Sequence, residues 1–143
     1  MHHLQRRERP GRGGRRVLLL DHANRAGKKI LISGGGRCNF TNLHTTSANF
    51  LSANPHFAKS ALARYTPADF LALVEHHHIP WHEKTLGQLF CDRSATDIVS
   101  MLEQECTAAG VTVILSTLIE NITHSHGFHL QTSRGVFTGS SLV

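Results

Sequence analysis

The chain has 143 residues, of which 40% are apolar, and a formal net charge of +5 at pH 7. This length is enough to bury one hydrophobic core, so we expect one domain rather than several. No apolar run approaches the roughly 20 residues of a membrane-spanning helix, which predicts a protein without a membrane partner. Three widely spaced cysteines without a Cys-x-x-Cys motif indicate reduced thiols in the cytoplasm rather than a disulfide framework.

The basic charge is concentrated at the N-terminal end. Residues 1–37 carry ten Lys or Arg against two acids, whereas residues 38–143 carry five against eight. We expect residues 1–14 to form a disordered basic leader and residues 15–143 to form an incomplete α/β domain. An Arg-rich head leaves nucleic-acid binding open as an alternative function. No aromatic residue interleaves its arginines as a stacking platform for bases requires, so nucleic acid is the less favoured partner.

The first predicted element is a strand over residues 17–20, a short unbroken apolar run. Such a run is typical of a parallel strand buried on both faces. Asp21 follows it directly. In dinucleotide-binding folds an acid at the end of the second strand accepts a hydrogen bond from a ribose hydroxyl of the adenosine. Asp21 is therefore a candidate nucleotide ligand, although solvation of a strand end also favours an acid there.

The most informative segment is residues 27–42, which read GKKILISGGGRCNFTN. Its glycines, Gly34, Gly35 and Gly36, reach positive φ easily and carry no Cβ atoms. Backbone N–H groups can therefore approach a phosphate or a flat ring closely. Arg37 adds a permanent cation with five hydrogen-bond donors. Together these features predict a ligand-binding loop.

The rest of the chain alternates between helical and strand patterns. Helices are predicted where apolar residues recur at helical spacing between capping signals: residues 57–65, a helix starting at Pro67 after a Thr66 cap, and residues 94–109 with Gly110 as the stop. Strands are predicted where β-formers alternate between turn residues: residues 79–84, 88–91, 111–117, 118–124, 127–133 and 135–139. The alternation predicts an α/β fold, a partial Rossmann-like domain with a short hairpin and a β-meander.

Twelve histidines invite a metal-site interpretation, but their spacing argues against one. Residues 76–78 are three consecutive histidines, and on a helix these point in different directions. On a strand His124 and His126 would share a face that His129 would not. Because no grouping matches a zinc-ligand spacing, we predict no metal site.

Residues 17–21 and 27–42 closely resemble the BaiN/RdsA-type family of bacterial NAD(P)/FAD-dependent oxidoreductases. That family combines an acid-ended strand with a segment of the form Gly-(Arg/Lys)-Lys-(Ile/Leu)-Leu-x-Ser-Gly-Gly-Gly-Arg-Cys-Asn-x-Thr-Asn. The resemblance continues through residues 54–57, 60–65 and 82–91 and covers nearly everything after Gly13. It implies an FAD/NAD(P)-binding Rossmann-like fold.

The resemblance also implies which residues hold the cofactor. Asp21 would contact the adenosine ribose, and the glycine segment would line the flavin side of an FAD site. The expected cofactor-binding residues are Asp21, Lys28, Lys29, Ser33, Gly34, Gly35, Gly36, Arg37, Cys38 and Asn39. FAD would carry the hydride chemistry, with NAD(P)H and an unidentified small-molecule substrate as partners in the intact family. No catalytic residue is assigned.

The opening of the chain departs from the family pattern. Family members are longer and begin with a strand and a Gly-x-Gly-x-x-Gly turn that holds the FAD pyrophosphate at a helix N-terminus. Residues 1–10 form neither, and residues 11–14 precede the acid-ended strand instead of following a first one. We therefore expect an internal fragment that binds FAD weakly or not at all and is inactive alone. A non-functional gene remnant is a further alternative.

Cys38 follows Arg37, and a neighbouring cation favours the reactive thiolate. A disulfide-type flavoenzyme also needs a second cysteine nearby, and the loop contains none. We expect Cys38 to pack near the flavin, with a redox role as the alternative.

Overall fold

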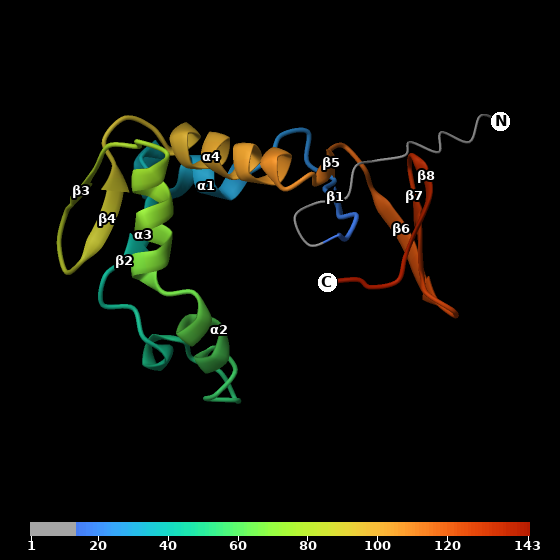
Figure 1. Ribbon diagram of the computed structural model, residues 1–143, viewed down its shortest axis with the longest axis horizontal. Coiled ribbons are helices and arrows are strands. Elements are labelled where there is room, and N and C mark those ends of the chain that lie inside the picture. The colour runs from blue at the N-terminus through green and yellow to red at the C-terminus, as the bar shows by residue number, and fades with distance from the viewer. Residues whose placement is uncertain (1–13) are drawn as a thin grey trace. The chain divides into compact units, whose positions relative to one another are not determined.

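The computed structural model describes residues 14–143 (Figure 1). It divides into two compact units: the chain up to Ala26 together with Gln104–Val143, and the segment Gly27–Glu103. Each unit is taken here by itself. Residues 1–13 of the expected basic leader lie outside the described residues, and Gly14 is exposed.

The first unit contains a parallel pair of strands, β1 (Leu18–Leu20) and β5 (Thr112–Ile114), in which Leu19 lies opposite Val113. The predicted parallel strand is confirmed. Its predicted burial on both faces is wrong, because Leu18 and Leu19 are 39% and 43% exposed. Among the described residues this sheet has two strands, which leaves apolar side chains of β1 in contact with solvent.

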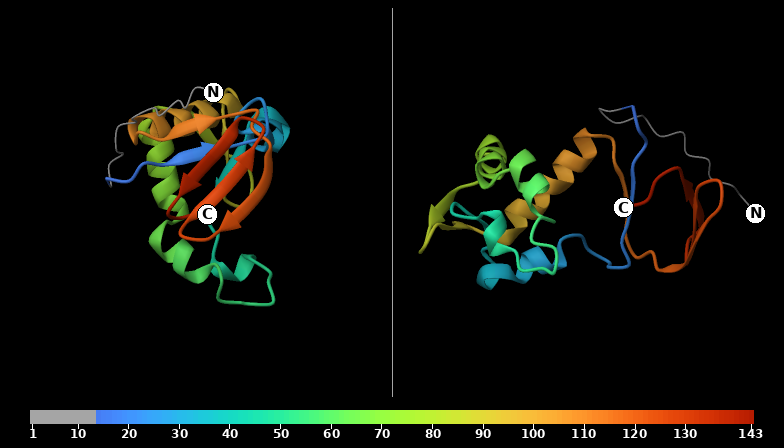
Figure 2. Two further views of the ribbon diagram at one scale, coloured as in Figure 1. Left: turned by 90° about the vertical axis from the view of Figure 1, so that its right-hand side faces the viewer. Right: turned by 90° about the horizontal axis from the view of Figure 1, so that it is seen from below.

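The same unit holds the predicted β-meander. Its strands are β6 (Ile119–His124), β7 (Phe128–Thr132) and β8 (Gly135–Gly139), paired antiparallel in the order β6-β7-β8 (Figure 2). Leu130 and Thr132 of the central strand are buried, whereas every residue of β6 is exposed. The meander therefore packs one set of alternating side chains and leaves the rest in water, as an antiparallel sheet commonly does.

The second unit is built from helices around a small sheet. Its elements are α1 (Lys28–Ile32), the 3₁₀ turn η1 (Ser33–Gly36), β2 (Asn39–Asn42), the 3₁₀ turn η2 (Ser47–Asn49), α2 (Lys59–Arg64), α3 (Pro67–His76), β3 (Trp81–Glu83), β4 (Gln88–Cys91) and the start of α4 (Ala95–Ala108). The strands pair antiparallel in the order β2-β4-β3. Helix α1 was not predicted, because its residues were interpreted as part of the glycine loop.

Local signals explain the helix boundaries and the hairpin. Thr66 Oγ1 accepts a hydrogen bond from the Asp69 N–H at 3.2 Å, and Asp69 Oδ2 accepts one from the Thr66 N–H at 2.7 Å. This reciprocal capping box starts α3 at Pro67, as predicted. Gly110, with φ 72°, follows the end of α4. The β3–β4 hairpin turns through Leu86 and Gly87, both at positive φ.

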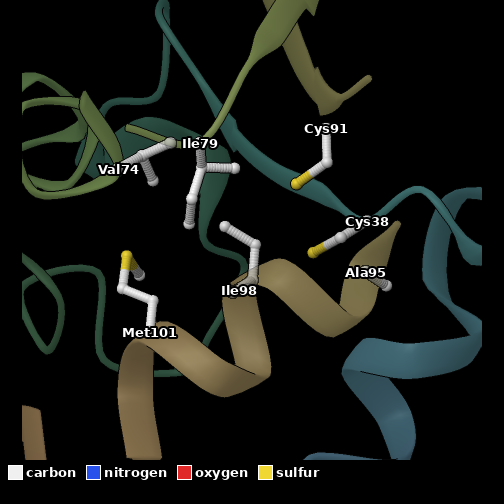
Figure 3. Close-up of a cluster of buried hydrophobic side chains, with 7 residues drawn as sticks. All are labelled: Cys38, Val74, Ile79, Cys91, Ala95, Ile98 and Met101. Carbon is white, nitrogen blue, oxygen red and sulfur yellow. The ribbon is translucent and has the colours of Figure 1, made fainter. Parts of the chain in front are cut away.

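The core of the second unit joins α3, α4 and the sheet. Val74 and Cys91 are fully buried, and Ile98 and Met101 of α4 are nearly so. Figure 3 shows this cluster, whose members are Cys38, Val74, Ile79, Cys91, Ala95, Ile98 and Met101. The core therefore includes Cys38, and packing of this side chain fixes the position of the residues that follow the glycine turn.

Candidate functional site

The glycine segment forms a tight left-handed turn rather than an open loop. Gly34, Gly35 and Gly36 have φ of 56°, 67° and 85°, as the sequence predicts for consecutive glycines. The Cys38 N–H donates to the Ser33 carbonyl at 3.1 Å and closes the turn. The Ser33 hydroxyl donates to the Ile30 carbonyl at 2.7 Å and joins the turn to α1. The backbone here is therefore fixed before any ligand arrives.

The three glycines differ in what surrounds them. A Cβ atom on Gly34 would lie 2.6 Å from Phe90 Cε1 and 2.9 Å from the Asn39 backbone nitrogen. A Cβ atom on Gly35 would meet nothing within 4 Å, and one on Gly36 would meet only the Leu31 carbonyl at 4.0 Å. Gly34 is therefore needed for packing inside the protein. The open space that a ligand can use lies at Gly35 and Gly36.

A pocket of about 280 Å³ lies beside this turn. It brings together four of the predicted cofactor-binding residues, Lys29, Ser33, Cys38 and Asn39. The remaining lining is largely apolar and comes from α1, β2, α3 and α4: Ile30, Phe40, Phe70, Ile98 and Leu102. Its volume is slightly below the ~300–1,000 Å³ of complete ligand sites. It therefore suits one apolar ring system with a few polar partners rather than a whole dinucleotide.

Five predicted residues of this unit lie outside the pocket lining: Lys28, Gly34, Gly35, Gly36 and Arg37. Lys28, on α1, and Arg37, just after the turn, are both exposed. The Arg37 carbonyl accepts a hydrogen bond from the Cys91 N–H at 2.9 Å, which ties the turn to β4. Both side chains present a cation to solvent near the turn, where an anionic group of a ligand would meet it.

Asp21 belongs to the first unit and lines a separate pocket of about 210 Å³. Its Oδ1 accepts a hydrogen bond from the Ala23 N–H at 2.9 Å. Its backbone carbonyl accepts one from the Thr117 N–H at 2.9 Å, so the end of β1 is tied to the segment that follows β5. The other lining residues are Leu20, His22, Thr117, Leu118 and Ile119. The parallel pairing of β1 with β5 brings this segment beside Asp21.

Sequence reasoning missed the lining supplied by residues 117–119, because it did not predict that β1 pairs with β5. It also missed Cys91, which lies in the same core cluster as Cys38.

On the hairpin, His82 Nδ1 lies 2.6 Å from Asp92 Oδ1, and the His82 ring stacks on Phe90 with centroids 6.2 Å apart. The sequence had marked His82 only by family resemblance.

Within residues 14–143 the side chains form no group of three or more His, Cys, Asp or Glu that is placed to hold a metal ion. No helix in this part of the chain has both the length and the apolar character needed to cross a membrane.

Comparison with known proteins identifies relatives. A family model described as "HI0933-like protein Rossmann domain" matches residues 8–143. The chain is 58% identical over 112 residues to the ribosomal RNA dihydrouridine synthase of Escherichia coli (strain K12), covering 78% of this chain and 28% of the relative. It is 52% identical over 109 residues to the protein of the same name from Haemophilus influenzae, covering 76% and 27%.

A more distant relative is the 3-dehydro-bile acid delta(4,6)-reductase of Clostridium scindens, 27% identical over 110 residues, with 76% of this chain and 26% of the relative covered. The chain thus spans less than a third of the length of each of these relatives. The family match covers nearly all of the chain and includes both pockets. The chain belongs to the HI0933-like Rossmann-domain family, the FAD-binding oxidoreductases of the BaiN/RdsA type.

Proposed function

We propose that this chain supplies part of the FAD site of an oxidoreductase in which the flavin transfers hydride between a nicotinamide nucleotide and an organic substrate. The observation that carries the proposal is the apolar pocket beside the glycine turn. It gathers Lys29, Ser33, Cys38 and Asn39 around a space that suits a single ring system.

The flavin end of the cofactor would lie at this pocket. Backbone beside Gly35 and Gly36 is open to a ligand, because no Cβ atom or neighbouring side chain fills the space. Lys29 and Arg37 supply cations that offset the negative charge of a reduced flavin. In this arrangement the protein orients the ring and adjusts its electronics, while the flavin, once bound, supplies the hydride chemistry.

The adenosine end would lie at Asp21. A carboxylate at the carboxyl end of a parallel strand is well placed to accept a hydrogen bond from a ribose hydroxyl. The neighbouring residues Leu118 and Ile119 give the 210 Å³ pocket an apolar wall for a base. Asp21 is therefore the proposed contact of this unit for the adenosine ribose.

The names of the relatives narrow the substrate class. The two most similar relatives described above act on ribosomal RNA and form dihydrouridine, and the third is a reductase of a bile-acid derivative. All three names describe reductions, which need a hydride donor. We propose that the whole protein reduces a uridine in RNA, since the rRNA enzymes share the higher identity with this chain.

Titration of the purified chain with FAD, followed by quenching of flavin fluorescence, tests the cofactor site. We expect weak but saturable binding. Asp21→Ala should lower the affinity about tenfold or more, because a hydrogen bond to a charged group contributes about 1.5–3 kcal/mol. Gly35→Val should lower it by filling the open space beside the turn.

Gly135→Val is the matched control, because Gly135 also has positive φ and open surroundings but lies in the meander. It should leave the affinity unchanged, and circular dichroism checks that each variant is folded. Absence of saturable quenching would contradict a cofactor site in this chain. Tight stoichiometric binding would instead contradict the expectation that the site is incomplete.

A further inference from the structure

Two cysteines far apart in sequence lie in the same buried cluster of the second unit. Asn39 pairs with Phe90 in the β2–β4 ladder, and the Cys91 N–H donates to the Arg37 carbonyl at 2.9 Å. These two links lie on either side of Cys38 and bring it near Cys91. Figure 3 shows both sulfur atoms in the same buried cluster, on the side where Ile98 lies.

The backbone at Cys38 is unusual for a residue with a side chain. Cys38 has φ 53°, in the left-handed region that non-glycine residues rarely adopt. Cys38 lies between the two links and is 5% exposed. Such strain persists where the surrounding structure imposes it, and it is common at functional positions. Here the residue in this conformation is a cysteine in the same buried cluster as Cys91.

A disulfide joins Cα atoms about 4.4–6.8 Å apart, so it forms only between cysteines that are held side by side. The proposal therefore requires that the two backbone links beside Cys38 bring the Cα atoms of Cys38 and Cys91 into this range. All three cysteines are free thiols in this structure.

The two thiols differ in access. Cys38 lines the 280 Å³ pocket, whereas Cys91 is absent from its lining and is fully buried. Burial, and then the charge of a Cys38 thiolate, raise the pKa of Cys91 to about 12. Cys91 therefore stays protonated at neutral pH, and a small reagent that enters the pocket meets Cys38 first.

We propose that Cys38 and Cys91 form a redox pair in which Cys38 reacts with hydrogen peroxide and Cys91 then forms the disulfide. The Cys38 thiolate attacks one peroxide oxygen, the O–O bond breaks, and Cys38 becomes a sulfenic acid as hydroxide leaves and takes up a proton. The Cys91 sulfur then attacks the Cys38 sulfur. Hydroxide leaves and takes the Cys91 proton as water, so one peroxide oxidises two thiols to one disulfide and forms two waters.

The disulfide would change the pocket directly. It would remove the Cys38 thiol from the pocket wall and join the glycine turn covalently to β4. The pair requires no bound FAD, so it goes beyond the proposed cofactor site and is tested without it. If FAD does bind at this pocket, oxidation of the pair would alter the wall against which the ring packs.

The test uses the wild-type 143-residue chain, so that no core substitution has to fold. The reduced chain is treated with one equivalent of hydrogen peroxide, unfolded in the presence of N-ethylmaleimide, and analysed by intact and peptide mass spectrometry. We expect a species lighter by about 2 Da before alkylation, as two thiols become a disulfide. Its peptides should show a Cys38–Cys91 link and an alkylated Cys106.

Three variants sharpen the result. Cys106→Ser is the matched control and should leave the link unchanged, because Cys106 is outside the cluster. In Cys91→Ser the sulfenic acid should persist at Cys38 and be trapped by dimedone, whereas Cys38→Ser should form no link. The proposal is overturned if the wild-type chain keeps both thiols alkylatable, or if the disulfide contains Cys106. It is also overturned if urea-unfolded chain forms the same link equally well, since the fold would then not be the cause.

Discussion

The two units bury their apolar residues to different degrees. In the second unit Val74, Leu89 and Cys91 are fully buried between helices and sheet. In the first unit the parallel strand β1 leaves Leu18 and Leu19 about two-fifths exposed, and β6 has no buried residue. The second unit therefore holds its glycine turn on a packed core, whereas the acid-ended strand of the first unit rests on a two-stranded sheet. The packing of an element therefore decides how firmly it holds the site residues that it carries.

The largest expected effect is the loss of stability when a core side chain of the second unit is truncated. Ile98→Ala should destabilise the second unit by about 2–5 kcal/mol, because truncating a buried aliphatic side chain loses its transfer free energy and leaves a cavity. Urea unfolding followed by Trp81 fluorescence measures it, since the single tryptophan lies on β3 of that unit.

The matched control is Ile122→Ala on β6, where the side chain is 47% exposed. It should change stability by less than about 0.5 kcal/mol, as is usual for surface substitutions. Circular dichroism follows the unfolding of this variant, because Trp81 lies in the other unit. Equal costs for the two variants would contradict the contrast between the units.

A smaller effect separates two adjacent glycines. Gly34→Ala should destabilise the second unit more than Gly35→Ala, because its Cβ would lie 2.6 Å from Phe90 Cε1, whereas Gly35 has open surroundings. Both pay about 1–2 kcal/mol for a side chain at left-handed φ. Urea unfolding measures both, and equal costs would mean that Phe90 moves aside without penalty.

The smallest effect concerns the α3 cap. Thr66→Ala should lower stability by about 1 kcal/mol, because it removes the side chain that accepts the Asp69 N–H. Thermal unfolding by circular dichroism measures the loss. Thr66→Ser keeps the hydroxyl oxygen and should be nearly neutral; a loss as large as that of Thr66→Ala would assign the effect to packing of the methyl group instead.

The same cap has a pH signature. Hydrogen bonds from the Thr66 backbone N–H, and then from its hydroxyl, hold the pKa of Asp69 below its ordinary value. A carboxyl whose pKa is lowered by folding contributes stability that is complete above its unfolded pKa and is lost as pH falls through the folded pKa. The difference between wild type and Asp69→Asn should therefore shrink below about pH 4.

Local signals allowed much of the secondary structure to be predicted. Thr66 and Pro67 start α3, Gly110 follows α4, and the Leu86–Gly87 turn makes the hairpin, each through chemistry contained within a few residues. The positive φ of the glycine turn also followed from composition alone.

The features that were missed depend on contacts between distant segments. The burial of β1 could not be judged from its own residues, because burial is set by what packs against a strand. The meeting of Cys38 with Cys91 spans a long stretch of chain and depends on the β2–β4 register. The lining of the Asp21 pocket by residues 117–119 likewise needs the pairing of β1 with β5.

Hydrogen exchange of the purified chain with and without saturating FAD tests the central claim most directly, because it reports both proposed ends of the cofactor in one measurement. We expect slower exchange in peptides that contain residues 33–39 and in peptides that contain residues 21–23 or 117–119. Peptides of the β7–β8 hairpin should not change. Unchanged exchange at both pockets, or protection confined to the meander, would contradict the proposal that Asp21 and the glycine turn contact FAD.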